Sequence, residues 1–393
     1  MIKQALISVY DKKYIVDFAR FLSSKGIKLI STSGTAKLLR DNGLEITDVS
    51  AITGFREILG GRVKTLHPSI LAGILARRED QLEELYSLGI EPIDIVVVNL
   101  YPFEGVVKRG AELEEALENI DIGGVTLIRA SAKNFKDVVI ITDPEDYGTV
   151  EKEIESTGDV SYEARKSLAI KAFAVTSRYD SIISNYLDGS RTPKYFLVGG
   201  ERSLELRYGE NPHQRGAFYE DLSLDPQGFM RYIEHWGEKE LSFNNLYDVQ
   251  AAFSLVREYE DPAVVIVKHN NPCGVATDPT LSVAAQKALS GDPVSAYGGI
   301  VAFNRPVDKE SAKVFRKLFI EVVIAPSYEE GARKIFSSKK NLRLIQAPLA
   351  SPAYFDLKKV DGGFLLQDKD ITDLDKDKWQ VVTEKKPTPQ EEE

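Results

Sequence analysis

The chain has 393 residues, of which 43% are hydrophobic and 28% are charged, a composition typical of a globular protein with two or three domains. Acidic residues outnumber Lys and Arg by 60 to 50, and this excess argues against binding to nucleic acid or to a membrane surface. A single cysteine, Cys273, excludes an intramolecular disulfide, and with only four histidines we expect no metal site.

The first 150 residues alternate between apolar runs and amphipathic stretches. Such strand–helix alternation predicts a parallel sheet covered by helices, in a doubly wound α/β domain. The predicted strands are 4–10, 27–31, 45–49, 93–100 and 138–142, and the predicted helices are 14–25, 32–43, 77–88, 112–119 and 123–133.

A second α/β unit follows a predicted helical connector at 151–187 and a Gly-, Ser- and Pro-containing boundary at 188–201. We therefore predict domains at 1–190 and 200–380 and a charged tail at 381–393, unpacked from 383 onward. With no leader and no apolar run of membrane length, the sequence predicts a cytoplasmic protein. In the second unit the predicted strands are 263–267, 299–303 and 322–325, and the predicted helices are 248–259, 282–289, 309–319 and 329–337.

Polar residues follow the predicted strands of the first unit. Ligands of open α/β sheets bind at the carboxyl ends of the strands, where residues 11–12, 32–35, 99–101 and Asp121 would meet. The hydroxyls and glycine of 32–35 begin a helix and favour an anion site, with simple N-capping as the alternative. Lys64 and Lys133 lie on segments that could reach the same edge. Lysines beside Asp121 suit proton transfer, although structural ion pairing is equally compatible.

The loop at residues 60–68 joins two glycines to Arg62, Lys64 and Thr65. Arg offers a planar fork for phosphate or carboxylate, and the pKa of a Lys shifts readily on burial. The alternative is a solvated basic turn. The polar residues expected at the sheet edge favour a ligand site for this loop, whereas His67 is expected to be structural.

The second unit carries polar residues at 206–214 and the pair Lys268 and His269 at a strand end, before an expected Pro/Gly turn. A Lys beside a His is a plausible acid–base pair, although a lone His is more often structural. Residues 272–276 invite comparison with zinc deaminases, but the second thiolate and the His-x-Glu signature are absent. That metal reading fails.

Taken together, these segments resemble the bifunctional purine-synthesis family that joins AICAR transformylase to IMP cyclohydrolase. The resemblance runs from Ala5 to Gln367 and rests on long motifs in the family's order. They are STSGTAKLLR, ITGFREILGGRVKTLHP, VVNLYPFE, IDIGGVTLIRASAKN, RYGENPHQ, KHNNPCGVA, GDPVSAYGGIVAFN and DGGFLLQD.

The resemblance implies a methylglyoxal-synthase-like first domain that closes the ring of formyl-AICAR to give IMP without a cofactor. Lys133 then matches the principal catalytic lysine, and Lys64, Tyr101 and Asp121 match supporting acid–base groups. The matched nucleotide contacts are Tyr10, Asp11, Lys12, Thr32, Ser33, Gly34, Thr35, Arg62, Val63, Lys64, Thr65, Val98, Asn99, Asp121 and Ile122. A regulatory nucleotide-binding module and a methylglyoxal-synthase-like phosphate lyase are the alternatives.

For the second domain the resemblance implies a partial cytidine-deaminase-like fold that transfers formyl from 10-formyltetrahydrofolate to AICAR. His269 matches the proton acceptor, and Lys268 its transition-state partner. Later family segments, Ser-Asn-Ala/Ser and Ser-Asp-Ala-Phe-Phe-Pro-Phe, are absent, so we expect an incomplete transformylase. A homodimer is expected, and a separate chain could supply the missing part. The matched substrate contacts are Arg207, Tyr208, Asn245, Gly298 and Glu321.

Overall fold

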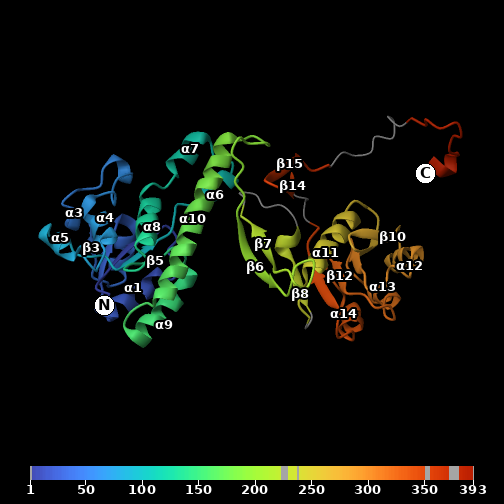
Figure 1. Cartoon of the computed structure of the whole chain (residues 1–393), viewed down its shortest axis with the longest axis horizontal. Coiled ribbons are helices and arrows are strands. Elements are labelled where there is room, and N and C mark those ends of the chain that lie inside the picture. Colours follow the sequence, from blue (N-terminus) through green and yellow to red (C-terminus); the bar gives the residue numbers. More distant parts are fainter. Residues whose placement is uncertain (1, 223–228, 237–238, 350–354, 371–379, 393) are drawn as a thin grey trace. The chain divides into compact units, whose positions relative to one another are not determined.

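The computed structural model describes residues 2–222, 229–236, 239–349, 355–370 and 380–392 (Figure 1). The chain divides into two compact units that meet in sequence at Gly199 and Gly200, and each is described by itself. In the described ranges, no helix has the length and apolar character needed to cross a membrane. Parts of the predicted second domain (223–228, 237–238, 350–354 and 371–379) and Glu393 of the predicted tail lie outside the described residues.

The first unit is built on a five-stranded sheet in which every pairing is parallel, with strand order β3-β2-β1-β4-β5. The chain adds strands in one direction from β1 to β3 and in the other from β4 to β5. Right-handed crossovers therefore place α1 and α8 on opposite faces of the sheet, as in the predicted doubly wound fold. The strands are β1 (Gln4–Ser8), β2 (Lys28–Ser31), β3 (Thr47–Asp48), β4 (Ile95–Val98) and β5 (Val139–Ile141).

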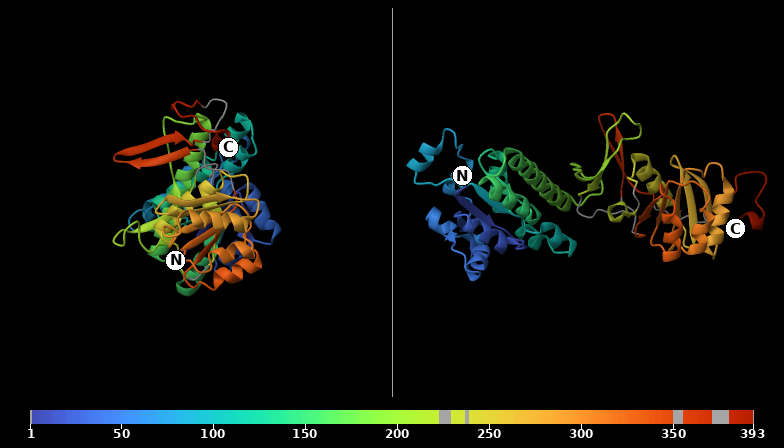
Figure 2. Two further views of the ribbon diagram at one scale, coloured as in Figure 1. Left: turned by 90° about the vertical axis from the view of Figure 1, so that its right-hand side faces the viewer. Right: turned by 90° about the horizontal axis from the view of Figure 1, so that it is seen from below.

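Burial on both faces explains why β4 and β5 are wholly apolar. All four residues of central strand β4 are buried, and so are all three of β5 at the edge of the sheet. The helices of this unit are visible around the sheet in Figure 2. They are α1 (Ile15–Ser24), α2 (Ser33–Asp41), α3 (Val49–Thr53), α4 (Pro68–Leu75), α5 (Leu82–Ser87), α6 (Phe103–Lys108), α7 (Leu113–Glu118), α8 (Gly123–Lys133), α9 (Tyr147–Thr157) and α10 (Tyr162–Asp188).

Several predicted boundaries in this unit are wrong. The predicted helix at 77–88 is only α5, and α3, α4 and α6 were not predicted. Helix α4 begins at Pro68, which suits a first helical position, and His67 Nδ1 accepts a hydrogen bond from the Ser69 N–H at 3.2 Å. His67 is thus a helix cap. The predicted connector is two helices, because Gly158 takes a left-handed φ of 77° between them.

The second unit contains a six-stranded mixed sheet with the order β10-β9-β11-β12-β13-β8. Strands β11, β12 and β13 are parallel, whereas β9 is antiparallel to β10 and β11, and β8 is antiparallel to β13. Helix α11 packs on one face with Val265 and Val267, and α12, α13 and α14 pack on the other with Val264 and Ile266. The strands are β8 (Glu234–Trp236), β9 (Ala263–Lys268), β10 (Asn271–Thr277), β11 (Ile300–Phe303), β12 (Val322–Ala325) and β13 (Arg343–Gln346).

Helices in this unit lie where the sequence predicts them, with shifted ends: α11 (Phe243–Val256), α12 (Leu281–Gly291), α13 (Lys309–Val314) and α14 (Glu330–Ser337). Two separate hairpins were not predicted, namely β6 (Gly200–Leu206) with β7 (Gly216–Asp221), and β14 (Phe355–Val360) with β15 (Gly363–Asp368). A one-turn helix, η3 (Phe229–Tyr232), precedes β8. The predicted tail holds a short helix, α15 (Pro389–Glu392).

Candidate functional site

The carboxyl ends of β1 and β4 lie side by side where the strand order reverses, and one side chain joins them. Asn99 Oδ1 accepts hydrogen bonds from the N–H groups of Tyr10 at 2.5 Å and Asp11 at 2.9 Å. Asn99 Nδ2 donates to the Asp11 carbonyl at 3.1 Å. Val98, the last residue of β4, is buried beneath this junction. Open α/β sheets bind ligands at such a reversal point.

The start of α2 presents hydroxyl groups next to this junction. Thr32 Oγ1 lies 3.2 Å from Ser8 Oγ, and Thr35 Oγ1 donates to the Val9 carbonyl at 3.1 Å. Lys12 Nζ donates to the same carbonyl and to Thr35 Oγ1 at 2.7 Å. The side chains of Thr32 and Thr35 are buried, whereas Ser33 and Gly34 are exposed. The exposed N–H groups at this positive helix end can therefore receive an anion.

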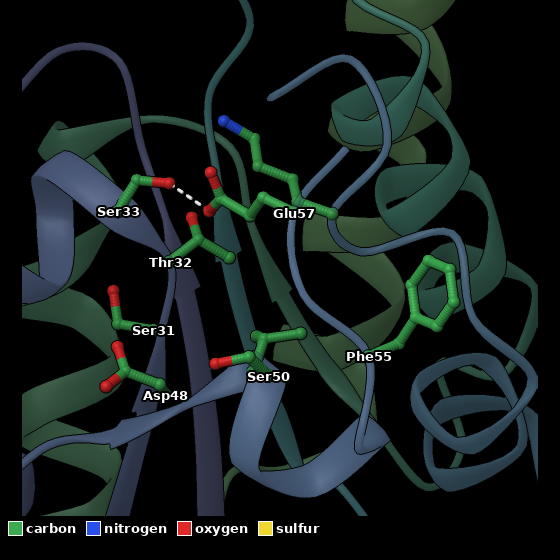
Figure 3. A pocket seen from close by; sticks show the side chains of 9 residues that line it. Ser31, Thr32, Ser33, Asp48, Ser50, Phe55 and Glu57 are labelled. Carbon is green, nitrogen blue, oxygen red and sulfur yellow. Dashed lines mark hydrogen bonds between the residues drawn. The ribbon is translucent and has the colours of Figure 1, made fainter. Parts of the chain in front are cut away.

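A carboxylate from the loop after α3 already occupies part of this helix start. Ser33 Oγ donates to Glu57 Oε1, as Figure 3 shows. Both residues line a small pocket with Lys64. The rest of the pocket wall is formed by Ser31, Thr32, Asp48, Val49, Ser50 and Phe55.

The loop that carries Arg62 and Lys64 turns sharply before returning. Leu59, Gly60 and Gly61 have φ values of 53°, 65° and 92°, and Ile58 pairs with Val63 across the turn. These glycines provide left-handed conformations that other residues rarely adopt.

The neighbouring side chains of this loop differ in their surroundings. The Arg62 guanidinium forms a salt bridge with Glu118 of α7 in which both side chains are exposed. Thr65 is buried, and its Oγ1 lies 3.0 Å from the point where a Cβ of Gly123 would be, which places the hydroxyl at the start of α8.

Lys64, Tyr101 and Asp121 come together at this edge from three different segments. Lys64 Nζ lies 3.5 Å from the Tyr101 hydroxyl. Asp121 Oδ1 accepts a hydrogen bond from the Gly124 N–H at 2.6 Å, so the carboxylate caps α8. Ile122, which follows Asp121 in the sequence, is exposed. The ring of Tyr10 packs edge-on against that of Tyr101, with centroids 5.5 Å apart.

The charges of this group affect one another. Burial raises the pKa of Asp121, and the N–H groups of Gly124 and Tyr101 and the Lys64 ammonium partly offset this rise. Burial also lowers the pKa of Lys12, and the nearby positive charge of Lys64 lowers it further. The lowered pKa of Lys12 and the raised pKa of Asp121 bring these two groups closer to exchanging protons near neutral pH than exposed groups of the same types.

Lys133 is not brought to this edge. It is the last residue of α8, whose first residue, Gly123, lies beside Thr65. A helix rises about 1.5 Å per residue, so the two ends of α8 are roughly 15 Å apart. The next residue, Asn134, donates to the Ile74 and Ala76 carbonyls at the amino end of the sheet. Lys133 is exposed there, and its proposed catalytic role stays a prediction.

One edge of the six-stranded sheet gathers most of the predicted residues of the second unit. Lys268 ends β9, and Gly298, Glu321 and Arg343 stand at or just before the starts of β11, β12 and β13. Backbone hydrogen bonds tie them in a row: Glu321 N–H donates to the Gly299 carbonyl, and Arg343 N–H donates to the Glu321 carbonyl. Because β9 runs antiparallel to β11, β12 and β13, the carboxyl end of β9 lies at the same edge as the amino ends of the other three strands.

Side chains of α11 reach this row. Asn245 Nδ2 donates to Glu321 Oε2 at 2.9 Å, and Arg343 Nη1 lies 3.7 Å from the same oxygen. Arg207 donates to the Tyr208 hydroxyl at 3.0 Å and stacks on its ring. The pKa of buried Arg343 is lowered, first by burial and also by the positive charge of Arg207.

Lys268 and His269 lie at the other end of the row, where the expected Pro/Gly turn is wrong. The turn consists of His269 and Asn270, with φ values of 51° and 65°, and residues 272 and 274 belong to β10. Two central residues with positive φ are the signature of a tight hairpin turn that favours Asn. Asp248 of α11 accepts from the Asn270 N–H at 2.8 Å, and Lys268 Nζ donates to the Tyr297 carbonyl at 2.9 Å.

Sequence reasoning missed several residues that touch the candidate sites: Glu57, Glu118, Tyr179, Asp248 and Arg343. None belongs to a hydroxyl-, glycine- or histidine-containing pattern at a strand end, so only their contacts reveal them. In the described part of the chain, no three Cys, His, Asp or Glu side chains are grouped closely enough to hold a metal ion.

Comparison with known proteins decides the family. The model of the "AICARFT/IMPCHase bienzyme" family matches residues 131–393, and that of the "MGS-like domain" matches residues 14–126. The chain belongs to the bifunctional AICAR transformylase/IMP cyclohydrolase family. It is therefore a member of an enzyme family of purine biosynthesis, and its first domain is of the methylglyoxal-synthase-like type.

Relatives agree along the whole chain. The bifunctional purine biosynthesis protein PurH of Thermoanaerobacter sp. is 50% identical over 397 residues, covering 100% of this chain and 78% of the relative. PurH of Acetivibrio thermocellus is 48% identical over 402 residues, with the same coverage of each chain. A solved structure, "Crystal structure of ForH", is 37% identical over 47% of this chain and 96% of its own, with a TM-score of 0.42.

Proposed function

We propose that the first unit is an IMP cyclohydrolase that converts formyl-AICAR to IMP. The carboxamide nitrogen attacks the carbon of the formyl group in the same molecule, an N–C bond forms, and the formyl oxygen leaves as water. The observation that carries this proposal is the grouping of Lys64, Tyr101 and Asp121 beside the hydroxyl-rich start of α2. The family relationship supports it.

The proposed roles follow from charge and position. The nucleotide phosphate binds the N–H groups and hydroxyls of residues 32–35 and the fork of Arg62, while residues 10–12, Val63, Thr65, Asn99 and Ile122 enclose the ribose and base. Asp121 accepts the proton lost by the attacking nitrogen. Lys64, with the Tyr101 hydroxyl, donates a proton to the departing oxygen. Because the ring closure is intramolecular, positioning supplies much of the rate, and the proposed steps use no cofactor.

Lys133 remains in the proposal on family resemblance alone. Its place at the far end of α8 means that it acts on the Lys64 site only if another chain, or a rearranged α8, presents it. Lys133→Ala is the direct test. An unchanged rate of IMP formation would remove Lys133 from the mechanism without affecting the roles of Lys64 and Asp121.

The test of the cyclohydrolase is the conversion of formyl-AICAR to IMP by the purified chain, followed by absorbance, with a chelator present and no folate added. We expect turnover that is lost in Lys64→Met. Nucleotide binding without turnover would instead support a regulatory module, and release of methylglyoxal from a triose phosphate would support a lyase.

We propose that the second unit contributes to formyl transfer from 10-formyltetrahydrofolate to AICAR. The row formed by Lys268, Gly298 and Glu321, with Asn245 bonded to Glu321, supports this proposal. His269 would accept the amine proton and Lys268 would stabilise the developing charge, while Arg207 and Tyr208 hold the phosphoribosyl group. We propose that this half transfers formyl slowly by itself, because the resemblance to the family implies an incomplete transformylase site. Robust transfer by the isolated chain would contradict that expectation.

We also propose that the chain forms a homodimer through its second units, as the family resemblance implies. A separately encoded chain that supplies further transformylase residues is proposed as a second partner, which is compatible with the homodimer. Light scattering of the purified chain distinguishes a dimer from a monomer. If a separate chain completes the transformylase, adding the C-terminal part of a related transformylase should restore formyl transfer.

A further inference from the structure

One side chain of α10 reaches the candidate site of the first unit. Tyr179 is 8% exposed, and its hydroxyl accepts a hydrogen bond from the Asp121 N–H at 2.8 Å. The same hydroxyl donates to the Asn119 carbonyl at 3.1 Å. A single oxygen thus joins both ends of the short segment that enters α8. The hydrogen bond to Tyr179 is made by the backbone N–H of Asp121 itself.

The position of the Asp121 carboxylate depends on this segment. Its Oδ1 accepts from the Gly124 N–H at 2.6 Å, so the residue is held at the backbone by Tyr179 and at the side chain by α8. The ring of Tyr179 is fixed in turn, because it packs edge-on against Phe103 with centroids 6.2 Å apart. Burial raises the pKa of Tyr179 to about 12, and the hydroxyl keeps its proton at neutral pH.

We propose that Tyr179 is a positioning residue for the proposed cyclohydrolase reaction: its hydroxyl fixes the segment from Asn119 to Asp121 and thereby aims the Asp121 carboxylate at the substrate. This inference rests on the proposed function of the first unit. Tyr179 acts through Asp121 and touches no reacting atom. A misplacement of about 1 Å in such a group can cost roughly 100-fold in rate.

The same helix offers a matched control. Tyr186, two turns further along α10, also packs edge-on against Phe103, with centroids 5.6 Å apart. Its hydroxyl donates to the Ala111 carbonyl at 3.5 Å, in the loop before α7, well away from Asp121 in sequence. Tyr186→Phe therefore removes a comparable hydroxyl from the same cluster and leaves the Asp121 contacts in place.

The experiment measures kcat and KM for formyl-AICAR in wild type, Tyr179→Phe, Tyr186→Phe, Asp121→Asn and the double variant Tyr179→Phe/Asp121→Asn. We expect Tyr179→Phe to lower kcat about ten-fold and to change KM by less than about two-fold, since the phosphate-binding groups lie on other segments. Tyr186→Phe should retain the wild-type kcat. In the Asp121→Asn background, loss of the Tyr179 hydroxyl should cost no further rate, because coupled residues are not additive.

Three results would overturn the positioning role: an unchanged kcat in Tyr179→Phe, an equal loss in Tyr186→Phe, or the same fold-loss with and without the Asp121 carboxylate. Thermal unfolding and IMP affinity report the fold of each variant, and a variant that unfolds at the assay temperature is compared in the cold. If the wild type itself fails to convert formyl-AICAR, the proposed function is wrong. Wild-type turnover with an insensitive Tyr179→Phe overturns the positioning role alone.

Discussion

The Asn99 side-chain oxygen accepts a hydrogen bond from the Tyr10 N–H at 2.5 Å and so links the ends of β1 and β4. These two strands flank the point at which the strand order of the sheet reverses. The amide nitrogen of Asn99 closes the link by donating to the Asp11 carbonyl. One side chain thus sets the spacing between the segments that carry Lys12 and Tyr101.

Replacing Asn99 with Ala should lower kcat/KM for formyl-AICAR by roughly 100-fold, because both segments lose their common anchor. The free energy of unfolding should fall by only about 1 kcal/mol, since the released backbone groups are exposed and can bond to water. Steady-state kinetics and urea unfolding measure the two effects. Asn42→Ala is the control, because Asn42 makes a similar exposed hydrogen bond to the Leu38 carbonyl outside the site. Equal losses in both variants would contradict the prediction.

Lys64→Met should reduce kcat by about 100- to 10,000-fold, the usual range for removal of a general acid or base. Tyr101→Phe should have a smaller effect, because it removes only the partner that lies 3.5 Å from the ammonium. Lys13→Met, which breaks a salt bridge to Glu145 on the surface, is the matched control for loss of one positive charge. A Lys64→Met enzyme as fast as Lys13→Met would refute the proposed role.

The rate should depend on pH through Asp121. Burial raises its pKa, so a carboxylate that accepts a proton becomes protonated at a higher pH than an ordinary aspartate, whose pKa is about 3.9. The acid limb of the kcat profile is therefore expected above that value, with activity falling as the pH drops through it. Asp121→Asn should remove this limb together with most of the rate. A limb that persists in Asp121→Asn would assign it to another group.

The raised pKa of Asp121 also predicts that its ionised carboxylate, which the proposed reaction requires, lowers the stability of the fold. Because the pKa of Asp121 is higher in the folded chain than in the unfolded chain, its contribution to stability is greatest at low pH and is lost as the pH rises through the folded value. Asp121→Asn should therefore unfold at a higher temperature than wild type at neutral pH, with the difference vanishing in acid. Thermal unfolding at several pH values measures this, and a lower Tm at neutral pH would contradict it.

Two carboxylates occupy groups that the proposal assigns to phosphate: Glu57 accepts from Ser33, and Glu118 pairs with Arg62. A phosphate must displace both and also meets their negative charges. Glu57→Gln should consequently bind IMP about five-fold more tightly, as measured by calorimetry. Glu115→Gln, whose carboxylate pairs with Arg109 instead, should leave the affinity unchanged. Weaker binding by Glu57→Gln would show that this carboxylate assists the ligand.

The parallel sheet of the first unit could be predicted because buried strands have continuous apolar runs. The meeting of residues 11–12, 32–35, 99–101 and Asp121 at one edge then follows from strand direction. Residue types do not state which end of a helix points to the site, and the 11-residue α8 places Lys133 at the end away from Gly123. The contacts of Glu57 and Glu118 with the site depend on a loop in which three successive residues have positive φ values. The sequence pattern does not predict this conformation.

In the second unit, Pro272 and Gly274 favour a turn by composition, yet the turn forms two residues earlier. Asp248 accepts from the Asn270 N–H and stabilises that position, a contact between segments 22 residues apart. The sequence predicts strands close to β9, β11 and β12 but not β13, so it does not predict that Arg343 joins the other residues of the row at one edge. Pairing between distant short strands depends on tertiary packing more than on local preference.

The glycine pair that begins α8 restricts how this protein can change. A Cβ on Gly124 would lie 2.5 Å from Asp121 Oδ2, and one on Gly123 would lie 3.0 Å from Thr65 Oγ1. Any side chain at Gly124 would push the carboxylate off the helix start. Neither natural mutation nor laboratory redesign can therefore introduce a larger residue at Gly124 without displacing the Asp121 carboxylate. Substitutions should instead be tolerated in the loop that carries Glu57 and in α7, where most side chains are exposed.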